Sequence, residues 1–399
     1  MEAIESLAAL QTPDGSAALH AAGEVAGADP LVAASALRAR GIPAALATAA
    51  LTQAVLRARA RAKFGADAAT MFFTRAGLEQ ATRPAVSHRR AARLAEAGVT
   101  RLADLGCGIG SDAIAAARAG IRVDAVEADP LTAAVAAANA RVLGLSDRLV
   151  VSCVDATTVD LSTVDAVFCD PARRADGGRR VFDPRSFTPP WDFVAGLPAR
   201  VPRTVLKLAP GVDHALIPAG TEAEWVSVNG DVVEAAFWCG PLARVPRRAS
   251  LLSDRLPDGA TLSGGGTLAA PVGPVRRYLY DPDGAVVRAH LVAEFASIVD
   301  GTLADPRIAY VYADACPPTP FGRCFAVQDR LPLSVKRLRA ELRERGVGRL
   351  TIMKRGSALE PERLRRELRL SGPAEATVIL TRVADAPTAL LVNPIAAGR

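Results

Sequence analysis

A glycine-rich turn is the strongest chemical signal in the sequence. It reads Asp104-Leu-Gly106-Cys-Gly108-Ile-Gly110 and stands between an expected short strand, Arg101–Leu105, and an expected helix, Ser111–Ala119. Glycines at such a turn let the backbone come close to a bound molecule. The amides at the start of the following helix have no partner within that helix. The turn therefore predicts a ligand-binding loop, but a glycine motif alone does not identify the ligand.

Acidic residues follow the next expected strands. Glu127 ends the strand after the turn, where a carboxylate can accept hydrogen bonds from two ribose hydroxyls. Asp155 follows a second strand, at a position that can face an adenine edge, and Asp170-Pro171 closes a third. Because the carboxyl ends of parallel strands lie on one edge of a sheet, we expect these residues to surround one site.

A dinucleotide is the first alternative ligand for such a loop. Its fingerprint is G-x-G-x-x-G or G-x-G-x-x-A, but here the last position of that pattern is Ser111, and the glycines follow G-x-G-x-G. Asp104 also suits a ligand with a positively charged amino-acid group. S-adenosylmethionine has such a group and no pyrophosphate, so the pattern favours this methyl donor over NAD.

The region Ala81–Gly240 resembles class I S-adenosylmethionine-dependent methyltransferases. That resemblance implies a Rossmann-like sheet of seven strands, the last one antiparallel, with a terminal hairpin made of Glu224–Val228 and Val233–Trp238. It also implies roles for the donor-site residues: Asp104, Gly106 and Gly108 line the methionine part, Glu127 holds the ribose, and Asp155 with Ala156 meets the adenine.

A narrower resemblance involves three segments: Phe72–Thr82, the glycine turn, and Cys169–Arg174. They are similar to a bacterial group of methyltransferases that carry a THUMP-like C-terminal domain and are distantly similar to trimethylguanosine synthase. The resemblance implies that a helical N-terminal extension reaches the donor site through Glu79, Gln80 and Thr82. It also implies RNA as the substrate class, since THUMP domains proper occur in RNA-modifying enzymes.

The run after the expected strand Val164–Cys169 is the candidate catalytic loop. Asp170 and Pro171 stand where many nucleic-acid methyltransferases carry Asn/Asp-Pro-Pro-aromatic. In those enzymes the first side chain and the proline carbonyl bind the acceptor amine, and the aromatic ring stacks on the flipped base. Ala172 and Arg173 replace the second proline and the aromatic residue. We expect Asp170, Pro171 and Arg173 to align the acceptor, and the missing ring leaves the acceptor atom open.

Three basic residues near this loop are substrate-binding candidates with alternative interpretations. Arg173 can stack on a base or hold a phosphate, or it can pair with a nearby carboxylate. Arg174 follows directly and either binds substrate or belongs to a solvated Arg-Gly loop. Lys207, on the expected strand Thr204–Leu208, either contacts substrate or covers apolar surface with its stem.

The length and the alternation of expected strands and helices predict an α/β protein of two or three domains. The chain has 399 residues, and after Arg89 the pattern runs helix, strand, helix, strand. We expect four regions: a helical N-terminal domain (1–85), a Rossmann-like methyltransferase domain (86–240), a bridging region with short strands or a small α+β unit (241–329), and a smaller α/β THUMP-like module (330–395).

Two basic segments bear on the partner. The expected helix Ala44–Lys63 ends with Arg57, Arg59, Arg61 and Lys63, and Lys336–Arg369 is rich in arginine. Each is either a solvated helix face that suits the helix dipole and i,i+4 pairing, or a contact for a polyanion. The net charge of +6 is compatible with RNA. We therefore expect an RNA methyltransferase acting on a tRNA or rRNA base. The alternatives are a small-molecule or protein methyltransferase, and a non-catalytic RNA-binding protein that keeps the donor pocket as a relic.

The cysteines and the hydropathy pattern indicate a cytoplasmic protein without metal. The six cysteines lie far apart and form no C-x-x-C pair, and only four histidines occur, so we expect no zinc site. The N-terminus is acidic, which argues against a secretory signal. The longest apolar stretch, Ile42–Leu56, is too short to span a membrane. The sequence predicts no oligomeric state.

Overall fold

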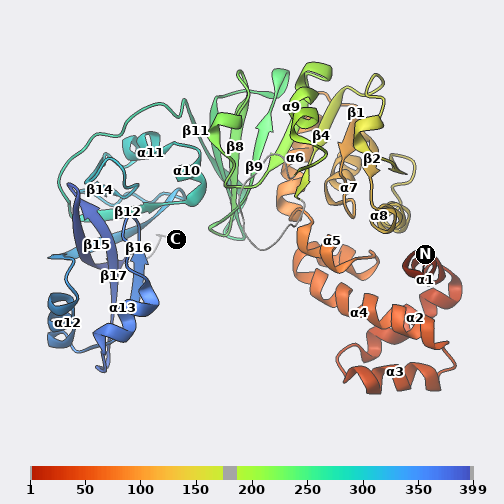
Figure 1. Ribbon diagram of the computed structural model, residues 1–399, viewed down its shortest axis with the longest axis horizontal. Helices are drawn as coiled ribbons and strands as arrows, with labels where there is room; N and C mark the ends of the chain where they lie inside the picture. Colours follow the sequence, from red (N-terminus) through yellow and green to blue (C-terminus); the bar gives the residue numbers. More distant parts are fainter. Residues whose placement is uncertain (1, 174–186, 396–399) are drawn as a thin grey trace. The chain divides into compact units, whose positions relative to one another are not determined.

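The computed structural model describes residues 2–173 and 187–395 (Figure 1). They fall into two compact units. The first unit comprises Met1–Thr221 and Phe237–Ala243, and the second comprises Glu222–Ala236 and Arg244–Arg399. Arg174, a candidate substrate-binding residue, lies outside the described residues.

The first unit begins with four helices, in which α1, α2 and α3 all pack against α4. Thr12 caps α2 by accepting a hydrogen bond from the Gly15 amide, and Asp29 caps α3 in the same way through Leu31. Each cap precedes a proline in the first helical turn. The helices are α1 (Glu2–Leu10), α2 (Pro13–Val25), α3 (Pro30–Ala39) and α4 (Ala44–Phe64). The helix expected at Ala44–Lys63 is thus confirmed as α4, to within one residue.

A short connection leads from α4 to the sheet. It contains the 3-10 turn η1 (Gly65–Ala69), a buried extended segment at 71–73, and the helices α5 (Arg75–Gln80) and α6 (Pro84–Glu96). The Gln53 side chain of α4 bonds both backbone polar groups of Phe73, donating to its carbonyl at 2.8 Å and accepting from its amide at 3.0 Å. The buried side-chain amide of Gln53 therefore provides the hydrogen bonds that a neighbouring strand would otherwise provide to this segment.

Five parallel strands follow, with β1 in the middle. β1 pairs with β2 and β4, β2 pairs with β3, and β4 pairs with β7. Because parallel neighbours require crossover connections, helices separate them along the chain. The chain moves outward from β1 in one direction and then in the other, and such a switch point is where open α/β sheets bind ligands. The elements are β1 (Arg101–Leu105), α7 (Ser111–Arg118), β2 (Arg122–Glu127), α8 (Pro130–Val142), β3 (Leu149–Cys153), β4 (Ala166–Cys169), α9 (Trp191–Arg200) and β7 (Thr204–Leu208).

The complete strand order of this sheet is β11-β10-β8-β9-β7-β4-β1-β2-β3. β8 (Glu222–Val228) and β9 (Asp231–Trp238) form the expected hairpin, joined by Asn229 and Gly230, which both have positive φ. The seven strands expected within 86–240 are present as β1, β2, β3, β4, β7, β8 and β9, and two strands from the bridging region extend the sheet to nine. β10 (Arg247–Ser253) runs parallel to β8, and β11 (Leu256–Gly264) runs antiparallel to β10. The strand pattern of β11 was obscured because its sequence, LPDGATLSG, contains proline and glycine, which are depleted in strands.

The second unit contains a seven-stranded sheet of order β13-β14-β12-β15-β18-β17-β16. Helices α12 and α13 contact each other and β16. Their leucines Leu338, Leu342, Leu364 and Leu368 are buried against strand residues that include Val378 and Leu391. The elements are β12 (Tyr278–Pro282), α10 (Gly284–Arg288), α11 (Val292–Ile298), β13 (Thr302–Leu303), β14 (Val311–Ala313), β15 (Gly322–Pro332), α12 (Val335–Glu344), β16 (Val347–Lys354), α13 (Pro361–Leu368), β17 (Ala374–Val383) and β18 (Ala386–Pro394).

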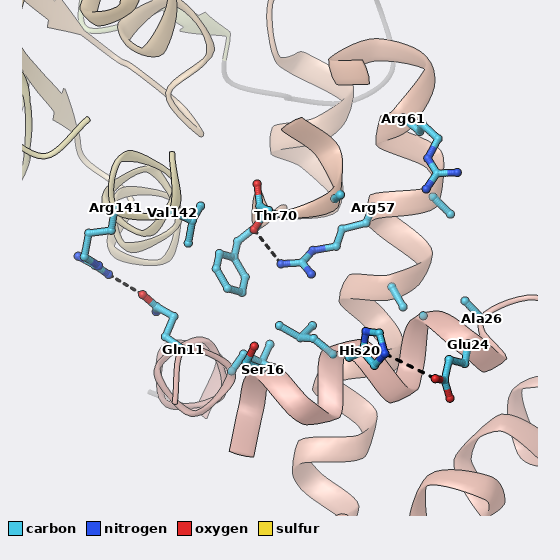
Figure 2. A pocket seen from close by; sticks show the side chains of 17 residues that line it. Gln11, Ser16, His20, Glu24, Ala26, Arg57, Arg61, Thr70, Arg141 and Val142 are labelled. Atoms are coloured by element: carbon cyan, nitrogen blue, oxygen red, sulfur yellow. Dashed lines mark hydrogen bonds and ion pairs between the residues drawn. The ribbon is translucent and has the colours of Figure 1, made fainter. Parts of the chain in front are cut away.

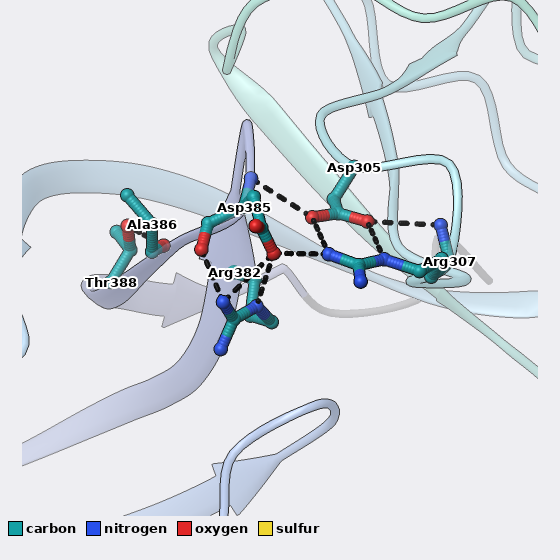
Figure 3. A network of polar contacts seen from close by, with 6 residues as sticks. All are labelled: Asp305, Arg307, Arg382, Asp385, Ala386 and Thr388. Carbon is teal, nitrogen blue, oxygen red and sulfur yellow. Dashed lines mark hydrogen bonds and ion pairs between the residues drawn. The ribbon is translucent and has the colours of Figure 1, made fainter.

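A network of charged residues holds the turn between β17 and β18 (Figure 3). The buried carboxylate of Asp305 accepts hydrogen bonds from the amides of Arg307 and Asp385, both at 3.0 Å. Arg307 also pairs with Asp385, and Arg382 binds Asp385 at 2.8 Å. Ala384 and Asp385 have φ values of 45° and 64°, which side chains rarely adopt. The network therefore fixes a turn that the backbone alone does not favour.

Candidate functional site

The carboxyl ends of five parallel strands meet at one edge of the first unit. The register shows that β2 and β4 end level with β1, β3 ends level with β2, and β7 continues past the end of β4. Loops that leave the sheet at this edge therefore start side by side. The candidate residues in this group are Gly106, Glu127, Asp155, Asp170 and Lys207.

The glycine loop needs the conformations that glycine allows. Gly106, Gly108 and Gly110 have φ values of 87°, 56° and 95°, a region in which a side chain is strained. The amides of Gly106 and Cys107 both donate to the carbonyl of Val126, at 2.9 and 3.0 Å. A Cβ at position 106 would lie 3.1 Å from the carbonyl oxygen of Asp170. The backbone of the glycine loop therefore lies directly against the backbone of the candidate catalytic loop.

Asp104 is buried, and neither of its carboxylate oxygens has a hydrogen-bond partner among the described residues. Burial, together with the negative charges of Asp112 and Asp170, raises the pKa of Asp104 well above its usual range. An unpaired carboxylate in a protein interior is costly. Its position at the end of β1, beside the glycine loop, fits a ligand that brings a positive charge to it.

The Glu127 carboxylate shapes the neighbouring turn. One oxygen accepts from the amide of Gly108 and the other from the amide of Asp129, both at 3.0 Å. Each oxygen keeps a second lone pair for a hydroxyl group. Beyond β3, Asp155 is exposed and caps the 3-10 turn η2 (Ala156–Thr158) by accepting from the Thr157 amide, while Ala156 is buried.

The N-terminal segment is held directly against the glycine loop. Asn139 of α8 accepts from the Phe72 amide at 2.7 Å and donates to the carbonyls of Phe72 and Ile109 at 3.1 and 3.0 Å. A Cβ on Gly77 would lie only 2.3 Å from Cγ2 of Ile109. These contacts explain the glycine in the Phe72–Thr82 run, because α5 can approach the loop only without a side chain there.

Of the three residues expected to reach the donor site from this segment, Glu79 and Gln80 are exposed and Thr82 is buried. The Thr82 side chain is buried, and its backbone carbonyl accepts a hydrogen bond from the Ser111 hydroxyl at 2.8 Å. Gln80 ends α5 with an exposed side chain. Thr82 is therefore joined to the start of α7, directly after the glycine loop.

A buried ion pair, missed in the sequence, lies beneath the loop. Arg90 of α6 pairs with Asp112 of α7, and its guanidinium carbon lies 4.6 Å from the centre of the Phe168 ring. Burial alone would raise the pKa of Asp112, but the positive charges of Arg90 and Lys207 outweigh burial, so the pKa is lowered. The sequence carried little signal of this pair, because α6 contains several arginines and Arg90 also fits a surface position.

The candidate catalytic loop is tied to its neighbours. The Asp170 amide donates to the carbonyl of Leu105 at 3.3 Å, and its carboxylate pairs through Oδ2 with the ammonium of Lys207. Pro171 is buried. Ala172–Arg173 forms the short strand β5, which pairs with β6 (Phe187–Thr188). A backbone ribbon therefore follows Asp170-Pro171 at the place where related loops carry an aromatic ring.

Comparison with known proteins identifies the family. The chain is 34% identical over 345 residues to uncharacterized S-adenosylmethionine-dependent methyltransferases from two strains of Mycobacterium tuberculosis, CDC 1551 / Oshkosh and ATCC 25618 / H37Rv. Each alignment covers 82% of this chain and 91% of the relative. The protein is an S-adenosylmethionine-dependent methyltransferase.

Two family models match parts of the methyltransferase. Residues 322–394 match the model described as THUMP domain-like, and residues 3–60 match a domain of unknown function (DUF8688). A crystal structure from Porphyromonas gingivalis W83, itself only provisionally assigned as a methyltransferase, shares the fold. It has a TM-score of 0.71 at 22% identity and covers 88% of this chain and 91% of its own. The predicted cofactor class and the THUMP-like module are thus confirmed.

Lys63 of the methyltransferase corrects one expectation about the basic end of α4. Instead of pointing into solvent, its ammonium donates to the carbonyl of Leu78 at 2.8 Å. Burial, followed by the positive charges of Lys207 and Arg83, lowers the pKa of Lys63 to about 8. The Lys63 ammonium is therefore within electrostatic reach of Lys207, and no sequence pattern distinguished it from Arg59 or Arg61.

The arginine-rich segment of the THUMP-like module is largely paired. Its ion pairs are Arg345 with Glu341 and Asp329, Arg349 with Glu375, Lys354 with Glu360, Arg355 with Asp281, Arg363 with Glu367, and Arg365 with Glu362. The expectation of a solvated, paired face describes these residues. Lys336, Arg337, Arg366 and Arg369 are exposed, without an ion pair to any described residue.

The described residues also bear on metal binding and on membrane insertion. Within residues 2–173 and 187–395, no three His, Cys, Asp or Glu side chains form a group that could hold a metal ion. The same ranges contain no helix that is both apolar and long enough to cross a lipid bilayer.

Proposed function

We propose that this methyltransferase acts on RNA, at a tRNA or rRNA base, with the donor on the Asp104–Gly110 loop and the acceptor beside Asp170. The THUMP domain-like match at residues 322–394 carries the choice of RNA. The basic net charge of +6 and the exposed Lys336, Arg337, Arg366 and Arg369 on that module agree with a polyanionic partner.

The chain's residues fit S-adenosylmethionine. The unpaired carboxylate of Asp104 supplies a partner for the donor's ammonium group. Gly106 and Gly108 have no side chain, so the donor can approach the backbone of the glycine loop. Glu127 has a free lone pair on each oxygen for the ribose hydroxyls. Asp155 and Ala156 border the adenine, while Thr82 and Gln80 close the site from the N-terminal segment. When bound, S-adenosylmethionine would supply a methyl group on a sulfonium, and an aligned nucleophile would take up that methyl group as the carbon–sulfur bond breaks and a neutral thioether leaves.

Asp170 positions the acceptor. Lys207 holds Oδ2 of the carboxylate, so Oδ1 can accept an N–H from the acceptor, and the carbonyl of Pro171 provides a second acceptor group. The bond from the Asp170 amide to Leu105 fixes this loop to the end of β1. Alignment of the acceptor with the methyl group accounts for much of the rate of such a transfer. A loop that is fixed with its backbone directly against Gly106 therefore suits the reaction. Arg173 and Arg174 follow directly and contact the substrate in this proposal.

The test is transfer of tritiated methyl groups from S-adenosylmethionine to total RNA isolated from cells that lack the gene. Wild-type protein should label the RNA, and Asp170→Ala should lose the transfer while binding the donor almost as tightly. RNA from cells that carry the gene is the matched control and should accept little label. Labelling of only the small-molecule or protein fraction would refute the RNA assignment.

A further inference from the structure

A wide groove opens on the helical N-terminal part of the first unit (Figure 2). Its volume is about 1090 Å³, and helices α1, α2, α4 and α8 contribute to its walls. Small residues line it and keep it open, among them Gly23, Ala54, Ala58 and Ala69. None of its lining residues belongs to the donor or acceptor residues described above. The groove is therefore separate from the donor and acceptor residues.

Arginines line the groove from two sides. Arg57 and Arg61 lie four residues apart on α4, so they share one helix face and are separated by about 6 Å along its axis. Arg141 comes from α8, across the groove in Figure 2. Among the lining residues, all of them described, the single carboxylate is that of Glu24. It is already paired with Arg40 at 2.6 Å, so the arginine charges dominate the lining.

Arg57 is held in place by the protein. Its Nε donates to the carbonyl of Met71 at 2.9 Å and its Nη2 to the carbonyl of Thr70 at 2.8 Å. The guanidinium carbon lies 5.1 Å from the centre of the Phe72 ring. Nη1, which has no bond to a described residue, remains for a ligand. A guanidinium fixed in this way loses little entropy when it binds.

The chemistry of this lining selects phosphate. Guanidinium groups bind phosphate oxygens through parallel N–H donors, and the separation of Arg57 and Arg61 resembles that of consecutive phosphates along a nucleic-acid strand. Arg141 is steadied by Gln11, which accepts its hydrogen bond at 2.7 Å. Three arginines that line one groove suit a chain of phosphates better than a single anion.

We propose that this groove, lined by Arg57, Arg61 and Arg141, binds the phosphate backbone of the RNA away from the methylated nucleotide. The inference rests on the proposed RNA substrate and assigns a role to the helices that match the domain of unknown function at residues 3–60. The helical part then adds affinity without reading sequence, because phosphate contacts position a nucleic acid and base contacts specify it.

Gly23 offers a test that leaves the fold intact. A Cβ at Gly23 meets nothing within 4 Å, and the residue lies inside α2 and lines the groove. Because glycine weakens a helix interior, Gly23→Glu should fold at least as well as the wild type while placing a negative charge among the arginines. Arg38→Glu on α3 is the matched control, since it changes charge in the same helical part but does not line the groove.

Binding of total tRNA and of rRNA fragments is measured at a series of salt concentrations, with donor binding followed in parallel. For the double variant Arg61→Ala/Arg141→Ala we expect the slope of log K against log salt to fall by about 1.4 for single-stranded RNA, which is the loss of two phosphate contacts. Gly23→Glu should weaken binding at least fivefold. Arg38→Glu and all donor affinities should stay near wild type.

Two results would overturn the proposal, and they can be told apart. If wild-type protein binds and methylates RNA but the groove variants keep its salt slope, or Arg38→Glu weakens binding as much as Gly23→Glu, the groove is not the phosphate site and the RNA substrate stands. If wild-type protein binds no RNA, both the groove and the proposed function fail.

Discussion

Replacing Asn139 by alanine tests whether the N-terminal segment is built into the donor site. The side chain is fully buried and makes three hydrogen bonds to backbone groups of Phe72 and Ile109. Asn139→Ala leaves one amide and two carbonyls without their partner. Each unsatisfied buried group costs about 1–3 kcal/mol, and water entering the space recovers part of that. We therefore expect the free energy of unfolding to fall by about 3–6 kcal/mol, a large share of the stability of a typical domain.

The assay is urea unfolding followed by tryptophan fluorescence, together with calorimetric titration of S-adenosylmethionine. Asn139 also bonds Ile109 within the glycine loop, so the variant should bind the donor at least tenfold more weakly at a temperature where it is folded. Asn393→Ala, a change of the same type at an exposed position of β18, is the control and should leave both measurements unchanged. A loss of stability below about 0.5 kcal/mol, the range of ordinary surface substitutions, would refute the reasoning.

Three further predictions follow from the described contacts. Gly77→Ala places a Cβ 2.3 Å from the side chain of Ile109, and such overpacking costs about 1–3 kcal/mol. The affinity for the donor, measured by calorimetry, should therefore fall. An unchanged affinity would show that α5 does not support the glycine loop. The pKa of Lys63 is lowered to about 8 from 10.5, so between these pH values the unfolded state holds more protons and the free energy of unfolding rises with pH. The melting temperature of the wild type should therefore rise relative to that of Lys63→Met between pH 7 and 10. Parallel curves of melting temperature against pH for the two proteins would contradict a buried ammonium. Asp305→Ala removes the acceptor of two backbone amides, and each amide left without a partner costs about 1–3 kcal/mol. Hydrogen exchange at the β17–β18 turn should therefore speed up by about tenfold or more. Protection equal to that of the wild type would mean that the network does not hold the turn.

The sequence predicted the parallel sheet and the donor loop because local signals coincide there. Glycines mark the loop after β1 at positions where the backbone has positive φ. The carboxylates after successive strands were expected at one edge because parallel topology places them there. These features follow from short-range rules and from one rule of sheet geometry.

Other parts of the site depend on contacts distant in sequence. Asn139 stands in an alanine-rich helix, and only its bonds to Phe72 and Ile109 show why an amide is needed there. Lys63 looked like the other basic residues of α4, and its burial comes from the packing of α5 against the helix end. Short strands were expected in the bridging region, but not that β10 and β11 extend the sheet that contains β1, because strand pairing at the edge of a sheet overrides weak local propensity.

The claim that the methyl donor binds over the Asp104–Gly110 loop is tested most directly by titrating S-adenosylmethionine calorimetrically into wild-type protein and Gly106→Arg. Position 106 has φ of 87° and lies at backbone distance from Asp170, so the arginine fills the donor site while circular dichroism reports whether the fold survives. The account predicts one donor bound per wild-type chain and none by a folded Gly106→Arg. Equal binding by both proteins, or none by the wild type, would contradict it.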